Sequence, residues 1–351
     1  MRESGEKFTV AVVQAASVLF DTEKTIDKLG RLTQEAAEQG SQLVLFPEAF
    51  IGGYPKGLTF GATVGNVFGI TNVNPKGDRQ KDFVAYWKSA VEIPSDAMTR
   101  LGNIAAQNKV YLVTGLIERE GGTLYCTVVF FSPSGVYLGK HRKLIPTGAE
   151  RLVWGAGDGS TIPVFETPLG RMGAAICWEN YMPLLRSALY SKGIQLYLAP
   201  TADPKDSWLA TVRHIAVEGR CFVLSCNQFN RKKDYPNDYS AHFDGDAEAI
   251  VSRGGSCIVD PFGEVIAGPN YDSECILLAS VDMDDIIRGQ FGSDVVGHYS
   301  RPDVFKLLVN EEETTSAMFN SSLRKGVDNS VGRPVEPDDL LLSTVAKSGQ
   351  D

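Results

Sequence analysis

Apolar residues along this chain occur either in short continuous runs or at helical spacing. Residues 8–16 and 43–46 are continuous apolar runs, which are typical of buried strands. Between them, the apolar positions of residues 22–39 recur every three or four residues until Gly40, as in an amphipathic helix that ends at a glycine. This strand, helix, strand order indicates an α/β fold.

The pattern continues through the first half of the chain. Helical spacing returns over residues 95–108, and strand-like runs follow at residues 110–117 and 124–131. A Ser-Pro-Ser-Gly turn at residues 132–135 then closes a hairpin. The first half therefore combines helix-linked strands with a hairpin.

The second half repeats this order. Strands are predicted at residues 162–166, 171–176, 195–199 and 221–226, and helices at residues 182–192 and 206–220. A second Pro-Gly hairpin turn follows at residues 260–263. Two such halves suggest two sheets packed face to face with helices outside, within a single domain.

Three segments do not fit this order of strands and helices. Residues 54–91 are glycine-rich and begin with aromatic residues, and residues 228–255 are polar and charged. Loops of this length within a compact domain are usually functional or mobile, although either stretch could be a plain surface excursion. The tail, residues 311–351, lacks sustained periodicity, so we expect it to be largely disordered or to pack at a subunit interface, outside a domain of residues 1–310.

The composition is that of a soluble enzyme. At 351 residues and 43% hydrophobic content, the chain can bury a large core. Its net charge of −9 argues against nucleic acid as the natural partner. The first seven residues contain no apolar run, and no later run approaches the length of a membrane span. We therefore expect a cytoplasmic protein with no membrane partner.

The cysteines and histidines give little sign of a metal site. None of the six cysteines forms a Cys-x-x-Cys pair, and none of the four histidines has a zinc-site spacing, so no metal or cofactor is expected. Five of the cysteines are interpreted as reduced core residues, and Cys177 is the exception. The number of cysteines and histidines does not exclude a papain-like Cys–His pair. However, no histidine follows a strand as clearly as Glu48 and Lys143 do.

Three reactive side chains follow apolar strands. Cys177 comes directly after the apolar run 172–176, where a strand would hold it rigidly and the following turn would offer backbone N–H groups to a developing negative charge. Glu48 follows the strand 43–46, and Lys143 follows a strand-like segment. A lone cysteine in such a place is more often a small core residue. Together, however, the three groups suit addition to an electrophilic carbon: the carboxylate takes the thiol proton, the thiolate attacks, and the ammonium stabilises the resulting charge.

The segments around these residues resemble the signatures of the nitrilases, a branch of the carbon-nitrogen hydrolase superfamily. The matching segments are residues 46–55, 139–144 and 177–180, and the similarity extends from about residue 8 to about residue 305. The resemblance implies a four-layer α-β-β-α sandwich in which Glu48, Lys143 and Cys177 are the catalytic Glu, Lys and Cys. Trp178 after the cysteine is similar to the nitrilase branch, because amide-hydrolysing relatives more often carry tyrosine or another residue there.

The resemblance implies hydrolysis of an organic nitrile to a carboxylic acid plus ammonia. Glu48 would deprotonate Cys177, whose thiolate attacks the nitrile carbon to give a thioimidate. Addition of water and loss of ammonia would leave a thioester, which a second water hydrolyses, while Lys143 stabilises the developing charge. Glu150 resembles the second glutamate of the superfamily and would hold Lys143 or orient the water. Its alternative interpretation is a surface charge in a loop.

The sequence offers weaker candidates for substrate binding. Tyr54 lies close after Glu48, Trp178 and Glu179 flank the nucleophile, and Trp208 opens a predicted helix soon after a strand end. Aromatic residues in such places can line an apolar pocket, although most aromatic residues belong to the core. Arylacetonitriles and aliphatic nitriles both remain open as substrates.

Alternative functions remain within and outside this superfamily. The nearest are a hydrolase of amides or carbamoyl groups and a relative that hydrolyses cyanide. From a different class comes a catalytically silent, filament-forming scaffold, against which the intact Glu48, Lys143 and Cys177 argue. The resemblance also implies a homo-oligomer, because nitrilases commonly form dimers that extend into spirals.

Overall fold

The computed structural model describes residues 7–62, 78–240, 243–315 and 317. The chain separates into two compact units, Met1–Glu312 and Glu313–Asp351, and the fold described here is that of the first unit. Most of the predicted tail and part of the predicted loop 54–91 lie outside the described residues. Within the described residues, no helix is both long enough and apolar enough to cross a bilayer.

The first of two six-stranded sheets brings together strands from both ends of this unit. Its order is β14 (Cys275–Asp282), β1 (Lys7–Gln14), β2 (Ser41–Leu45), β3 (Tyr111–Glu120), β4 (Thr123–Phe131) and β5 (Tyr137–Arg142). Strands β1, β2 and β3 run parallel, and β4 is antiparallel to both β3 and β5. Strands β2 and β5 therefore point the same way. Their carboxyl ends, which precede Glu48 and Lys143, lie at the same edge of the sheet.

The second six-stranded sheet carries the nucleophile candidate. Its order is β13 (Val265–Asn270), β12 (Ser256–Val259), β9 (Phe222–Asn227), β8 (Leu196–Thr201), β7 (Gly170–Ala174) and β6 (Val164–Thr167). Strands β7, β8 and β9 are parallel. The end of β8 therefore lies beside the end of β7, from which the chain continues to Cys177.

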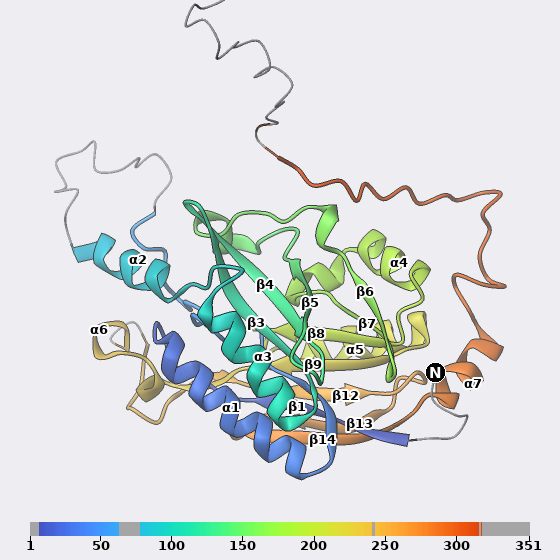
Figure 1. The fold of residues 1–351 in the computed structure, drawn as a ribbon, viewed down its shortest axis with the longest axis horizontal. Coiled ribbons are helices and arrows are strands. Elements are labelled where there is room, and N and C mark those ends of the chain that lie inside the picture. Colours follow the sequence, from blue (N-terminus) through green and yellow to red (C-terminus); the bar gives the residue numbers. More distant parts are fainter. Residues whose placement is uncertain (1–6, 63–77, 241–242, 316, 318–351) are drawn as a thin grey trace, which may run out of the picture. The chain divides into compact units, whose positions relative to one another are not determined.

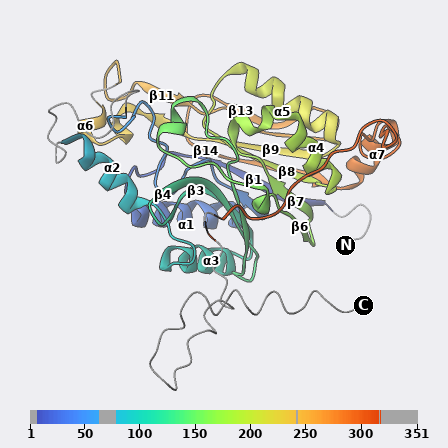
Figure 2. The same cartoon turned by 90° about the horizontal axis from the view of Figure 1, so that it is seen from above.

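Helices cover the outer face of each sheet (Figure 1). Helices α1 (Thr22–Glu38) and α3 (Asp96–Asn108) pack on the first sheet, and α4 (Pro183–Ser191) and α5 (Asp206–Gly219) pack on the second. Figure 2 shows the first pair on one side of the two sheets and the second pair on the other. The predicted four-layer α-β-β-α sandwich is therefore confirmed.

Alternating side chains of β1 show how the layers are held together. Val10 and Val12 belong to the core between the two sheets, which they share with Leu198 of β8. The intervening Ala11 and Val13 belong to a second core, beneath α1 and α3. Because both faces of the sheet are buried, its strands read in the sequence as continuous apolar runs rather than as alternating patterns.

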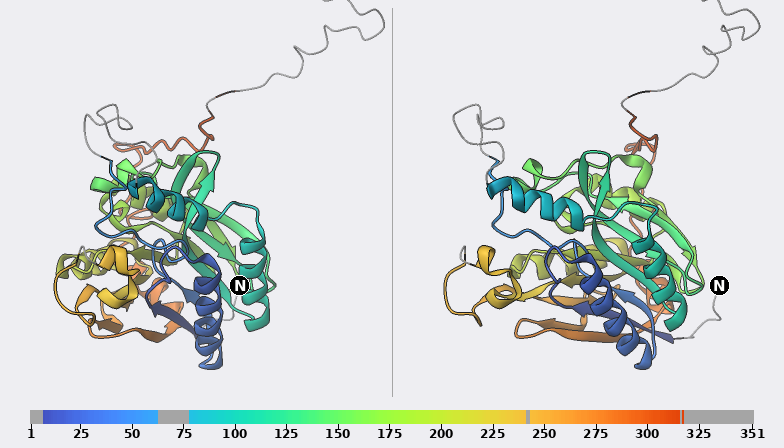
Figure 3. Two further views of the ribbon diagram at one scale, coloured as in Figure 1. Left: turned by 90° about the vertical axis from the view of Figure 1, so that its left-hand side faces the viewer. Right: turned by 60° about the vertical axis from the view of Figure 1, so that its left-hand side comes forward.

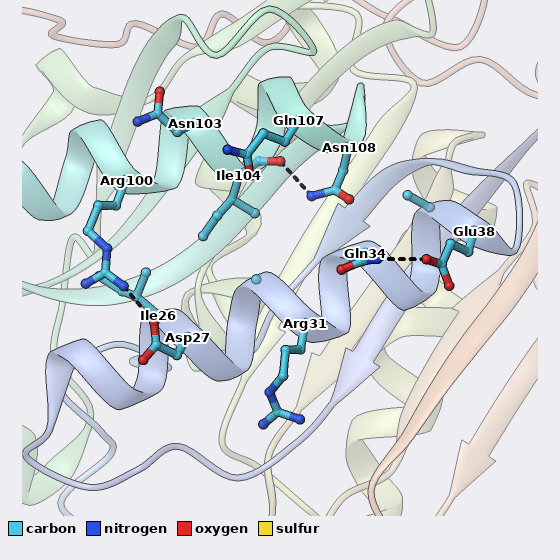
Figure 4. Close-up of a pocket in the computed structure, with 12 residues that line it drawn as sticks. Ile26, Asp27, Arg31, Gln34, Glu38, Arg100, Asn103, Ile104, Gln107 and Asn108 are labelled. Atoms are coloured by element: carbon cyan, nitrogen blue, oxygen red, sulfur yellow. Dashed lines mark hydrogen bonds and ion pairs between the residues drawn. The ribbon is translucent and has the colours of Figure 1, made fainter.

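Helices α1 and α3 lie side by side on the outside of the first sheet (Figure 3). Asp21 caps α1 by accepting a hydrogen bond from the backbone N–H of Lys24 at 3.0 Å. A groove runs between the two helices, where Arg100 Nη2 of α3 donates to Asp27 Oδ1 of α1 at 2.8 Å (Figure 4). None of the predicted site residues lines this groove.

The segments expected to be loops contain regular elements that the apolar pattern does not predict. Residues 54–91 include α2 (Asp78–Ser89), and residues 228–255 include β10 (Phe229–Arg231), α6 (Asn237–Ser240) and β11 (Ile250–Arg253). Strands β10 and β11 pair with each other in a separate two-stranded sheet, so neither shows the long apolar run of a core strand. After β14, α7 (Asp284–Gly292) follows. The described residues also contain four short 3-10 helices: η1 (Gly148–Leu152), η2 (Gly159–Thr161), η3 (Cys177–Tyr181) and η4 (Lys232–Asp234).

Candidate active site

Glu48, Lys143 and Cys177 come together where the strand ends of the two sheets meet. The Lys143 ammonium donates a hydrogen bond from Nζ to Glu48 Oε1 at 2.7 Å, and both side chains are fully buried. The Cys177 thiol faces the same carboxylate, whose charge is one of the causes that raise the pKa of the thiol. A carboxylate, an ammonium and a thiol therefore share one buried site.

Glu48 is held in place because its segment continues along β3 after leaving β2. The N–H of Gly115 donates to Pro47 O at 3.2 Å, and Gln228 Nε2 donates to Glu48 O at 2.9 Å. A Cβ atom at Gly115 would lie 2.3 Å from Pro47 O and 2.6 Å from the backbone nitrogen of Ala49. Glycine is therefore needed at this position for the Glu48 segment to lie so close to β3.

Cys177 is the first residue of η3, on the sharp turn that follows β7. Its φ of 53° is in the left-handed region, which costs a non-glycine residue about 1–3 kcal/mol unless its surroundings enforce it. The side chain of Asn180 helps to enforce it, because Nδ2 donates to Ala175 O at 2.9 Å and to Cys177 O at 2.7 Å. A strained turn of this kind presents a nucleophile at the end of a sheet.

Thr201, the last residue of β8, contacts the sulfur directly. Its hydroxyl donates to Cys177 Sγ at 3.2 Å and accepts from the N–H of Asp203 at 3.0 Å, which fixes its orientation. A donor at this distance favours the thiolate over the thiol. The apolar pattern of the sequence does not predict this role for Thr201. The feature that could have indicated it is the position of Thr201 at the end of β8, because β8 pairs with β7, the strand that precedes Cys177.

The charges at the site suit proton transfer from the thiol to Glu48. Burial raises the pKa of Glu48 above its ordinary value, although Lys143 works in the opposite direction. Burial, together with the Glu48 charge, also raises the pKa of the Cys177 thiol, so the thiol is protonated at rest. The second carboxylate oxygen of Glu48, Oε2, is buried and accepts no hydrogen bond from the described residues. A carboxylate with a raised pKa and a vacant oxygen can take up the thiol proton.

Lys143 remains a cation despite its burial. Burial alone would lower the pKa of Lys143, but the charges of Glu48 and Glu150 help to hold it well above its ordinary value. The ammonium also donates to Glu150 Oε2 at 2.7 Å. It can therefore supply a fixed positive charge in a buried site, where charges interact more strongly than in water.

Glu150 is nearly buried, with a side chain that is 10% exposed, rather than a solvated loop charge. It lies in η1 and accepts hydrogen bonds from three groups. They are Lys143 Nζ at 2.7 Å, the Tyr54 hydroxyl at 2.7 Å and the Thr147 N–H at 2.6 Å. Because the Tyr54 and Thr147 contacts fix the carboxylate, Glu150 in turn fixes the Lys143 ammonium.

A cavity of about 530 Å³ leads to Cys177. Tyr54, Trp154 and Trp178 give its wall aromatic surface, and Glu150 is also exposed to it. Trp178 is held by a hydrogen bond from its Nε1 to Asp203 Oδ2 at 2.7 Å. The cavity is large enough for a small organic molecule.

Two of the predicted pocket residues lie outside the wall of this cavity. Neither Glu179 nor Trp208 lines the cavity at Cys177. Trp208 is 2% exposed and faces the second sheet from α5, where its Nε1 donates to Ser225 Oγ at 2.7 Å. Glu179 is buried and bonds to His141. Position beside a strand end did not show which way these side chains point.

Histidine does not activate the thiol within the described part of the chain. His141 uses Nδ1 for Thr161 O and Nε2 for Glu179, His214 is exposed beside Glu218 on α5, and His298 is exposed beside Tyr299. The described residues contain no group of three or more His, Cys, Asp or Glu side chains placed to hold a metal ion. His242 lies outside the described residues.

All six cysteines are free thiols, and four besides Cys177 are buried. Cys275 differs from the expected core placement because it is only partly buried at the sheet edge, in β14. Cys126 lies against the site, where its thiol donates to Glu48 Oε1 at 3.6 Å.

The amino-acid sequence of this chain is similar to those of known enzymes. The carbon-nitrogen hydrolase family matches residues 9–290. A bifunctional nitrilase/nitrile hydratase from Nicotiana tabacum is 53% identical over 318 residues, which covers 90% of this chain and 89% of that protein. An aliphatic nitrilase from Sinorhizobium fredii is 54% identical over 312 residues, covering 89% and 98%, and nitrilase 1 of Arabidopsis thaliana is 52% identical over 326 residues, covering 92% of each.

Solved structures share the fold at lower sequence identity. The NitFhit protein of C. elegans has a TM-score of 0.67 at 21% identity, covering 90% of this chain and 70% of that one. An amidase from Nesterenkonia sp. AN1, with an acetamide moiety bound covalently to its active-site cysteine, has a TM-score of 0.59 at 21% identity. That match covers 82% of this chain and 95% of the amidase.

Proposed function

The chain belongs to the nitrilase branch of the carbon-nitrogen hydrolase family, and we propose that it hydrolyses organic nitriles through a covalent intermediate on Cys177. The observation that carries this mechanism is the buried arrangement of the thiol, the Glu48 carboxylate and the Lys143 ammonium. The products are a carboxylic acid and ammonia.

The first half of the reaction forms the bond to sulfur. Glu48 takes the proton of Cys177, and the thiolate attacks the nitrile carbon while Thr201 donates to the sulfur. The nitrile nitrogen receives the proton back from Glu48, which gives a neutral thioimidate. Lys143 stabilises the negative charge that develops on this nitrogen, and it can do so without reorganisation because Glu150 fixes it.

The second half consumes two waters. The first adds to the thioimidate carbon, with Glu48 as the base, and the resulting tetrahedral species loses ammonia to leave a thioester. The second water attacks the thioester, which releases the carboxylic acid and returns the proton to Cys177. If the tetrahedral species instead expels the thiolate, the product is an amide. The name of the Nicotiana tabacum relative, a nitrilase and nitrile hydratase, supports measuring both products.

Ammonia release tests this function directly. Purified protein is incubated with phenylacetonitrile, an aliphatic dinitrile, cyanide and the matching amides, and ammonia, acid and amide are measured. We expect acid and ammonia from at least one organic nitrile, at a rate well above that with its amide. Faster turnover of the amides would instead identify an amidase, and turnover of cyanide alone a cyanide-hydrolysing relative.

The described C-terminal part of the first unit supports a homo-oligomer. Its apolar side chains are unusually exposed, including Phe291 at 90%, Phe305 at 79% and Leu308 at 92%. Apolar side chains that are exposed along one segment of a single chain are candidates for a protein interface. A dimer that extends through a second contact into a spiral would cover such a surface. Light scattering should show a species larger than a dimer, and a fully active monomer at all concentrations would exclude this assembly.

A cytoplasmic location is also part of the proposal. Six free thiols support it, because exported proteins tend to oxidise cysteines to disulfides. Fractionation of the source cells, with activity followed in each fraction, tests it.

A further inference from the structure

A buried ion pair connects the two segments that carry Lys143 and Cys177. His141 lies in β5, two residues before Lys143, and Glu179 lies in η3, two residues after Cys177. The distance from His141 Nε2 to Glu179 Oε2 is 3.0 Å, and both side chains are fully buried. Because β5 and β7 belong to different sheets, this pair bridges the sheets beside the active site.

The hydrogen bonds of His141 define its charge. Its Nδ1 lies 2.5 Å from the carbonyl oxygen of Thr161, and its Nε2 faces the Glu179 carboxylate. The Thr161 carbonyl can only accept, so Nδ1 donates to it, and a Glu179 carboxylate would accept from a protonated Nε2, which would give the ring two protons. Burial alone would lower the pKa of His141, but Glu179 and the Thr161 carbonyl raise it above its ordinary value. The two contacts and this direction of the shift favour an imidazolium at His141.

The Glu179 carboxylate also binds the backbone next to both reactive residues. Its Oε1 accepts from the N–H of Leu144, which directly follows Lys143. Its Oε2 accepts from the N–H of Ile176, which directly precedes Cys177, at 2.7 Å. One carboxylate thus sets the distance between two segments of different sheets, and His141 holds that carboxylate in place.

We propose that His141 and Glu179 form a positioning unit that keeps Lys143 and Cys177 at the separation required for attack on the nitrile carbon. Neither residue lines the cavity, so the pair acts through the two backbone segments rather than on substrate. The inference rests on the proposed function, because it assigns the pair a role in that reaction. Small displacements matter here, since a shift of about 1 Å can cost roughly 100-fold in rate.

The Glu179→Asp variant tests this role. It keeps the negative charge beside His141, which favours folding, but shortens the reach to Leu144 and Ile176 by one methylene group. We expect kcat to fall about 10- to 100-fold while KM changes less than about threefold, because positioning affects the transition state more than ground-state binding. A Glu179→Asp enzyme with the wild-type kcat would overturn the proposal.

His214 provides a matched control. It forms a second histidine–glutamate contact, with Nε2 3.5 Å from Glu218 Oε1, but it is 64% exposed on α5. The His214→Asn variant should retain the wild-type kcat within about twofold, as expected for an exposed pair. An equal loss in His214→Asn and Glu179→Asp would mean that the effect is not specific to the buried pair, which would also overturn the proposal.

The protonation state gives a readout that a merely structural role would not share. Nitrogen NMR of histidine-labelled enzyme should show His141 with two ring protons at neutral pH, and a neutral ring there would contradict the proposal. As the pH rises through the raised pKa of His141, the imidazolium is lost, and kcat should decline. The His141→Asn variant should have a lower kcat without this alkaline decline. If the His141→Asn variant does not fold, NMR of the wild-type enzyme and the kinetics of Glu179→Asp still test the proposal.

Thiol alkylation separates failure of this inference from failure of the proposed function. The rate at which iodoacetamide alkylates Cys177, followed by peptide mapping, requires no nitrile. We expect at least a fivefold slower rate in Glu179→Asp than in the wild type, because the thiol is displaced from Glu48 and Lys143. If the wild type hydrolyses no nitrile, the function fails, and the alkylation rate still tests the positioning. An unchanged alkylation rate would then count against it.

Discussion

The Lys143 ammonium and the Glu48 carboxylate form a fully buried ion pair, with Nζ 2.7 Å from Oε1, at the edge of the first sheet where the carboxyl ends of β2 and β5 both lie. Removing two charges from water costs several kcal/mol each, and apolar residues of similar volume often stabilise a fold as well or better. The pair is therefore better explained by chemistry than by stability. It fixes one oxygen of Glu48 and leaves Oε2 free to accept a proton.

Removing either charge should abolish most activity. Glu48→Gln keeps the shape but removes the base, and Lys143→Ala removes the cation, so each should lower kcat by at least about 100-fold. The double variant should be little worse than the poorer single variant, because the groups act as a unit. Lys24→Ala, which alters an ion pair whose lysine is 72% exposed, should leave kcat unchanged. Fully multiplicative losses in the double variant would show independent roles.

The contacts of Glu150 predict a graded loss of activity. In Glu150→Gln an amide replaces the carboxylate that Lys143 and Tyr54 contact, so kcat should fall about 100-fold or more. Tyr54→Phe removes one hydrogen bond from Glu150 and should cost about tenfold. Steady-state kinetics together with circular dichroism will distinguish these losses from unfolding. A near-normal rate in Glu150→Gln would show that Lys143 does not depend on this carboxylate.

Thr201 should affect the acidity of the nucleophile. Thr201→Val keeps the shape but removes the donor to Cys177 Sγ, so the pKa of the thiol should rise and kcat/KM should fall about 10- to 100-fold. Thr201→Ser retains the hydroxyl and should restore most of the activity. The pH dependence of Cys177 alkylation measures the thiol pKa directly. The same profile in Thr201→Val and wild type would exclude this role.

The lowered pKa of Glu118 predicts that the folded protein loses stability in acid. Burial works to raise the pKa of Glu118, but hydrogen bonds from Arg142 and Lys140 outweigh it and lower the pKa below the ordinary value of 4.5. A lowered pKa contributes stability that is present above the ordinary value and is lost as the pH falls through the folded-state value. Wild type should therefore exceed Glu118→Gln in unfolding free energy at pH 7, and this difference should shrink at about pH 3. Urea unfolding at both values measures it, and a constant difference would contradict the assignment.

Much of the fold followed from the apolar pattern because the central strands of both sheets are buried on both faces. The same pattern located Glu48, Lys143 and Cys177 after strands, and strand direction explains why they meet. Pattern alone does not show which strands are neighbours. Thr201 lies beside Cys177 only because β8 pairs with β7, a relation between segments that the sequence does not display.

The sequence also did not show which way side chains point beside a turn. Trp178 and Glu179 are adjacent in the sequence, yet Trp178 lines the cavity and Glu179 is turned into the protein against His141. The 3-10 geometry of η3 separates them, and no periodic signal predicts so short an element. Strands β10 and β11 escaped prediction for a related reason, since they pair only with each other.

Ammonia release by the Cys177→Ala variant, with the nitrile that the wild type hydrolyses fastest, tests the covalent mechanism most directly. Cys257→Ala is the matched control, because Cys257 is a fully buried core cysteine in β12. Cys257→Ala should remain active and lose about 1 kcal/mol of stability. Cys177→Ala should fold and release no ammonia above background. Ammonia release by Cys177→Ala at a rate near that of the wild type would contradict the account.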